Sequence, residues 1–125
     1  MGSNAIIVYD MKNKDAWRIE HPYFHFDPNA GKYRVGGIEF YWSDGVSSAA
    51  LSKLNRDGYR DLYFHPTSST KQFKISTKLL KNKNASDDEL FKGVQVMCFS
   101  TYIIICYSTN IHLSLTCIFR CFLLQ

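Results

Sequence analysis

Short stretches of alternating apolar and polar residues run along the first three-quarters of the chain, separated by polar or glycine-containing turns. The alternation predicts a hairpin near the N-terminus, with strands over 5–10 and 16–20 joined by a polar turn. Further strands are expected over 35–42, 46–51, 60–65 and 72–80. Gly36 and Gly37 are expected to mark a bulge or a close backbone approach within the first of these. Residues 21–32 and 81–89 are predicted to be loops, and no segment shows the periodicity of an amphipathic helix.

About six short strands with turn signals every 8–12 residues predict an all-β protein: a sandwich, a barrel or a propeller. Spacing alone does not choose among the three. Aromatic residues make up 15% of the 125 residues, which favours a sheet-rich core that buries flat rings.

Composition changes abruptly near residue 95. All 11 acidic residues and all but one of the 15 Lys and Arg residues precede it, whereas all four cysteines (Cys98, Cys106, Cys117 and Cys121) follow it. We therefore expect two segments: a β domain over 1–95 and a hydrophobic tail over 96–125.

Three interpretations of this tail remain open. The uncharged run from Gly93 to Phe119 is long enough to span a bilayer, although eight polar residues dilute it. The cysteine spacing matches no zinc or redox signature, which argues against a genuine cysteine-bearing soluble segment. We favour the third interpretation, non-native sequence such as a translated intron. A membrane partner is expected only if the tail is native.

No secretory signal is recognisable at the N-terminus, because the apolar run Ala5–Tyr9 is too short and Asp10 follows it. Read literally, such a chain would stay in the cytosol unless its true start is missing.

Few residues suggest chemistry directly. His21, His25 and Asp27 carry metal-ligand side chains, but Pro22 and Pro28 disfavour the helix that would bring the two imidazoles together, so no metal site is predicted. The lysine-rich stretch 71–83 fits a solvated strand face, and the net charge of +4 is too small to require a nucleic acid partner. No phosphate-binding loop or nucleophile elbow is present, and no cofactor is predicted.

Four stretches carry a resemblance to a known family. They are IIVYDMKNKDAWRIEH (6–21), FDPNAGKYRVGGIEFYWSDGV (26–46), ALSKLNRDGYRDLYFHPTSST (50–70) and FKISTKLLKN (73–82). In this order and spacing they resemble the yellow/major royal jelly protein family of insects, over roughly residues 5–92. The resemblance implies a secreted six-bladed β-propeller, of which this chain would hold about two blades, followed by a tail that does not resemble the family.

On the family template, residues 46–51 look like the inner strand of a blade, and the ends of inner strands line the channel where ligands bind. Asp44 and Gly45 would lie at the mouth of that strand, where the carboxylate could pair with an amine. Tyr41 and Trp42 could stack on an aromatic ligand, and His65 could act as an acid. A turn-forming Asp44, core aromatic rings and a structural His65 are the alternatives. Asn84 begins a glycosylation triplet, Asn84-Ala85-Ser86, which has meaning only in a secreted protein.

The resemblance implies two kinds of function. Some members of the family are linked to melanin chemistry as dopachrome-converting enzymes, and others bind biogenic amines or serve as nutritive or developmental proteins. The sequence leaves open whether the protein is an enzyme. It predicts a small aromatic or amine ligand for the full-length protein, an extracellular location, and an inactive fragment for the chain as written.

Overall fold

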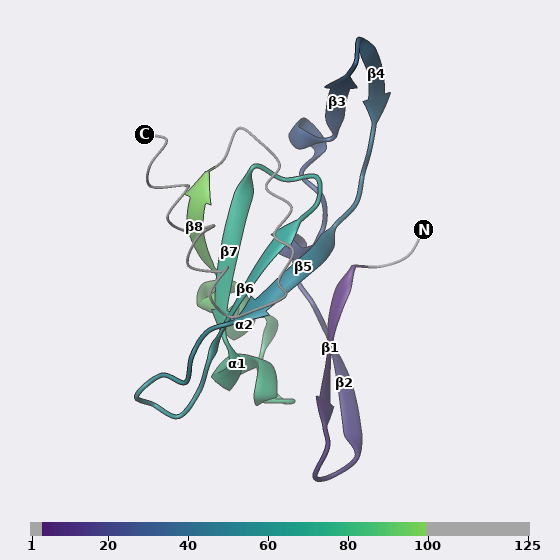
Figure 1. Cartoon of the computed structure of the whole chain (residues 1–125). Helices are drawn as coiled ribbons and strands as arrows, with labels where there is room; N and C mark the ends of the chain where they lie inside the picture. Colours follow the sequence, from purple (N-terminus) through teal and green to yellow (C-terminus); the bar gives the residue numbers. More distant parts are fainter. Residues whose placement is uncertain (1–3, 100–125) are drawn as a thin grey trace.

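The computed structural model describes residues 4–99, which form three antiparallel sheets and two short helices (Figure 1). In chain order the strands are β1 (Ala5–Asp10), β2 (Asp15–Glu20), β3 (Lys32–Val35), β4 (Ile38–Tyr41), β5 (Val46–Leu51), β6 (Asp61–Pro66), β7 (Lys71–Ser76) and β8 (Gln95–Phe99). Helix α1 covers Thr77–Lys81 and helix α2 covers Asp87–Gly93. Two 3₁₀ turns, η1 (Pro22–Phe24) and η2 (Pro28–Ala30), follow β2. The all-β prediction is confirmed.

The largest sheet has the order β5-β6-β7-β8, with each strand antiparallel to its neighbour. Four antiparallel strands in sequential order are the size of one propeller blade. Two-stranded hairpins, β1-β2 and β3-β4, make up the rest of the sheet structure. Figure 1 shows β3-β4 extending away from the four-stranded sheet, while β1-β2 lies beside it. The assignment to about two blades of a six-bladed ring stays a prediction.

Aromatic rings form the centre of the core. Phe24 from η1 is fully buried and meets Phe64 of β6 edge-on, with 5.0 Å between ring centroids. Phe64 in turn stacks on Phe73 of β7 at 5.3 Å, and Tyr23 stacks on the same Phe73 at 4.7 Å. The loop that follows β2 is therefore packed down on the large sheet, which places β2 next to it.

Two expectations about local structure are wrong. The predicted strand over 72–80 ends at Ser76, whose hydroxyl accepts the Lys78 N–H and starts α1. Helix α2 lies partly in the predicted loop 81–89 and begins with a capping box, in which Ser86 and Glu89 satisfy each other's main-chain N–H groups. Helices of one or two turns are too short to show an apolar period, so the pattern of hydrophobic residues missed both.

A third expectation is also wrong. Gly36 and Gly37 form the two-residue turn of the β3-β4 hairpin, not a bulge in one continuous strand. Both have positive φ, 59° and 83°, which a two-residue hairpin turn requires and which glycine adopts without strain. The predicted strand 35–42 is therefore split at the turn. Its second half, Ile38–Tyr41, pairs with Lys32–Val35, a strand that the alternation of residues does not predict.

Strand β8 crosses the predicted boundary at residue 95. It pairs with β7 from Lys74↔Gln95 to Lys71↔Phe99 and completes the four-stranded sheet. The remainder of the predicted tail, with Cys106, Cys117 and Cys121, lies outside the described residues, so its three interpretations stay open. Within residues 4–99 no helix has both the length and the apolar composition needed to cross a membrane.

Candidate functional site

The segment 42–45, which joins β4 to β5, lies along the turn between β6 and β7. Ser68, which is fully buried, donates from its hydroxyl to the Trp42 carbonyl at 2.6 Å, and its main-chain N–H donates to the Asp44 carbonyl at 3.1 Å. The Thr67 N–H donates to the Gly45 carbonyl at 2.9 Å. Sequence analysis passed over Ser68, because a serine in a polar turn carries no signal that its hydroxyl is buried.

Three of the predicted site residues lie together on the surface of this segment. The Trp42 indole N–H donates to the Asp44 carboxylate at 2.6 Å, so the ring and the charge form one unit. Tyr41 donates from its hydroxyl to the Pro28 carbonyl at 2.6 Å. Tyr41 and Trp42 are more than half exposed, and Asp44 is exposed as well. The rings are thus available to solvent and are not core residues, and the carboxylate is held beside an aromatic face.

Gly45 is buried at the base of the same segment. A Cβ atom there would collide with the main-chain oxygen of Phe24 and with the side chain of Asn4. Glycine is required here because the backbone passes too close to its neighbours for any side chain.

His65 is separated from this surface group by burial. Its Nδ1 lies 2.9 Å from the Lys71 carbonyl, so the ring closes the β6-β7 turn. Burial lowers the pKa of His65, and the hydrogen bond to the Lys71 carbonyl partly opposes that effect. The imidazole is therefore neutral near pH 7, and as the donor to a carbonyl it carries its proton on Nδ1. Nε2 is buried and unpartnered among the described residues.

The other candidate residues have structural partners. His21 Nδ1 accepts the Tyr23 N–H at 3.0 Å, and Asp27 accepts the Asn29 N–H at 2.9 Å, so each caps a 3₁₀ turn. In the described part of the chain, no three His, Cys, Asp or Glu side chains are grouped to hold a metal. Asn84 is exposed in the turn between α1 and α2, where its side chain is accessible for modification; its glycosylation stays a prediction.

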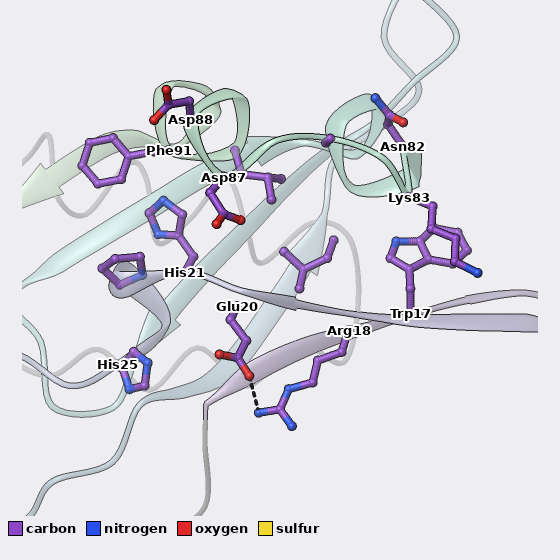
Figure 2. A pocket seen from close by; sticks show the side chains of 14 residues that line it. Trp17, Arg18, Glu20, His21, His25, Asn82, Lys83, Asp87, Asp88 and Phe91 are labelled. Atoms are coloured by element: carbon purple, nitrogen blue, oxygen red, sulfur yellow. Dashed lines mark ion pairs between the residues drawn. The ribbon is translucent and has the colours of Figure 1, made fainter.

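A cleft of about 840 Å³ lies apart from this surface group, between β2 and the helical segment (Figure 2). His21, Trp17 and Phe91 line it, together with Asp87 from the first turn of α2. No residue proposed from the sequence for ligand binding lines it, since its two walls are about 65 residues apart in the chain.

The fold and the surface group define a class: an all-β protein built of small antiparallel sheets, with a carboxylate and aromatic rings presented beside the first strand of a blade-sized sheet. Comparison with known proteins is more specific. Residues 1–111 match the profile described as "Major royal jelly protein". The chain belongs to the major royal jelly protein family. The match extends past residue 95, although the domain division predicted there stays a prediction.

Individual relatives are similar over part of the chain. It is 40% identical to L-dopachrome tautomerase yellow-f of Drosophila melanogaster over 76 residues, which are 61% of the chain and 18% of that relative. It is 39% identical over 86 residues to Protein yellow of Drosophila melanogaster and of Drosophila yakuba, covering 67% of the chain and 16% of each relative. The chain thus spans less than a fifth of the length of these curated relatives.

Proposed function

We propose that the chain is part of a secreted protein that acts in pigment chemistry by converting dopachrome. The observation that carries this proposal is the 40% identity to a relative named L-dopachrome tautomerase yellow-f. Membership of the major royal jelly protein family supports secretion. The reaction would take place in the longer protein, to which this chain contributes one wall of the ligand site.

The surface group around Asp44 fits an aromatic substrate. A tautomerisation moves a proton from one atom of the substrate to another, so it needs a group that accepts a proton and a group that donates one. Asp44 supplies a carboxylate, and the exposed rings of Tyr41 and Trp42 supply flat surfaces against which a catechol-derived ring can stack. The second proton-transfer group would come from outside residues 4–99, because His65 is buried in its turn.

The test follows the visible colour of dopachrome. The full-length gene product, secreted from insect cells, should bleach dopachrome faster than the uncatalysed rate, whereas the 125-residue chain should not. Asp44→Asn in the longer protein should slow bleaching at least tenfold, and Glu39→Gln, which neutralises an exposed carboxylate on β4, should leave the rate unchanged. Bleaching by the longer protein at the uncatalysed rate would refute the enzymatic proposal.

Binding of an amine without turnover is the second candidate function. It is favoured by the Trp42–Asp44 unit, because a carboxylate next to an exposed indole face suits an ammonium group attached to an aromatic ring. Calorimetric titration of the longer protein with dopamine or serotonin separates the two functions. Heat of binding without bleaching supports the binder, and Asp44→Asn should then weaken binding by about tenfold.

A further inference from the structure

The cleft beside β2 has one wall of strand residues and one wall of helix residues. Alternation along β2 directs Trp17 and Ile19 toward the large sheet, and His21 follows on the same face. Figure 2 shows α2 opposite His21, with the His21 ring between the labelled side chains of Phe91 and Asp87, whereas Trp17 lies beside Asn82 and Lys83. The volume of about 840 Å³ is within the usual range for small-molecule sites.

His21 lines this cleft and carries an unused hydrogen-bond donor. The residue is only 4% exposed, and Nδ1 accepts the Tyr23 N–H, so the ring proton of the neutral imidazole is on Nε2. That Nε2 is buried and has no partner among the described residues. Burial also lowers the pKa of His21, which keeps the ring neutral near pH 7. A buried N–H without an acceptor is costly, and a ligand oxygen would satisfy it.

Some charged side chains around the cleft have ion-pair partners and others do not. Lys83 pairs with Asp15 at 2.7 Å, and Arg18 pairs with Glu20 at 2.8 Å. Neither Asp87 nor Asp88 has an ion pair or a side-chain hydrogen bond within residues 4–99. Figure 2 shows the Asp87 carboxylate directed to the side of the cleft that holds His21, and Asp88 directed away from it. The cleft therefore presents, close to the unused donor, one negative charge that has no ion-pair partner among the described residues.

An aromatic surface lies next to both groups. The Phe91 ring stacks on His21 with 5.4 Å between centroids, yet Phe91 is still 51% exposed. Covering this half-exposed ring with a flat apolar molecule is favourable, because it removes apolar surface from water.

We propose that this cleft binds a small organic cation that has a flat apolar body and one oxygen acceptor. The cationic group pairs with Asp87, the oxygen accepts the His21 Nε2–H, and the flat body covers Phe91. The site is separate from the surface group at Asp44 and does not depend on the proposed role in pigment chemistry.

The test uses the 125-residue chain labelled with ¹⁵N and titrated with 4-methoxybenzamidine, which carries a planar cation, an aromatic ring and an ether oxygen. Saturable shifts are expected for the amides of His21, Asp87 and Phe91. The neutral isostere 4-methoxybenzamide should not saturate over the same concentration range. Absence of saturable shifts with the amidine, or equal binding of the neutral amide, overturns the proposal. This part of the test needs no variant of the protein.

Two variants then assign the contacts. Asp87→Asn should weaken amidine binding by about tenfold, because the charge-assisted bond is lost, whereas Glu39→Gln removes a carboxylate outside the cleft and should leave binding unchanged. His21→Asn keeps an acceptor for the Tyr23 N–H but removes Nε2. It should weaken binding of 4-methoxybenzamidine more than binding of benzamidine, which lacks the oxygen. Equal losses for Asp87→Asn and Glu39→Gln would show a general charge effect and contradict the assignment.

Discussion

At the residue scale, two imidazoles are held away from water. His21 is 4% exposed and His65 is 6% exposed, and burial lowers the pKa of each below its usual 6.5. Each uses Nδ1 to hold a local turn, so neither ring can leave the interior without breaking a main-chain contact. The unfolded chain consequently binds protons more readily than the folded chain in mildly acidic solution.

We predict that the free energy of unfolding falls as the pH drops below about 6.5. The contribution of the two neutral rings is fully present above the unfolded-state pKa and is lost as the pH falls toward the lowered folded-state values. Urea denaturation between pH 7.5 and 5 measures the slope. His65→Gln should flatten it, whereas His25→Gln, which replaces an exposed imidazole, should not. A slope that is the same in all three proteins would contradict this account.

Gly45 gives a second prediction at this scale. Gly45→Ala places a methyl group against the Phe24 carbonyl and Asn4, so the free energy of unfolding should fall by about 1–3 kcal/mol. Urea denaturation at pH 7.5 provides the measurement. Ser43→Ala, in the same segment but exposed, is the matched control and should change stability by less than about 0.5 kcal/mol.

At the scale of elements, alternation predicts most of the strands but not β3 or β8, and it predicts the connections poorly. The alternation of residues 5–10 and 46–51 locates β1 and β5, because one face of each strand packs against other residues and the other face is exposed to solvent. At Gly36-Gly37 a pair of glycines fits a hairpin turn as well as a bulge or a close approach, and the pairing of β3 with β4 decides for the turn. The spacing of Ser86 and Glu89 was likewise a readable capping signal for α2.

The candidate sites divide in the same way. Tyr41, Trp42 and Asp44 are neighbours in sequence, so their grouping could be expected without coordinates. The burial of His65 and the cleft at His21 depend on packing between segments far apart in the chain, which no local pattern encodes.

The capping box of α2 should contribute measurably to stability. Ser86→Ala removes the hydroxyl that accepts the Glu89 N–H and should lower the free energy of unfolding by about 1 kcal/mol. Ser86→Thr keeps both the cap and the glycosylation triplet, and Asn84→Gln removes the triplet alone. Both should stay close to the parent protein in urea denaturation of unglycosylated material. If Ser86→Thr loses as much as Ser86→Ala, the cap is not the cause.

At the scale of the whole molecule, the sheets are open. Ile7 and Tyr9 on β1 are 72% and 58% exposed, and in the described residues β1 pairs only with β2. An exposed apolar strand with one unpaired edge is a template for association with further strands. In a closed ring of blades, such edges and faces would be covered by neighbouring sheets.

We therefore predict that the isolated chain self-associates as its concentration rises. Ile7→Lys places a charge on the exposed face of β1 and should shift the association to at least tenfold higher concentration, as measured by sedimentation velocity. Ile38→Lys, on the exposed β3-β4 hairpin, is a control of equal charge and similar exposure. Equal suppression by both variants would indicate a general effect of charge on solubility.

The Trp17 indole N–H donates to the Leu80 carbonyl at 2.9 Å and joins β2 to the end of α1 across 63 residues of sequence. Because this ring is partly buried while Trp42 is half exposed, the two tryptophans differ as fluorophores. In a Trp42→Phe background, the emission of Trp17 alone would report whether the N-terminal hairpin is seated on the helical segment. Detachment of the hairpin would then be visible as a red shift before the four-stranded sheet itself unfolds.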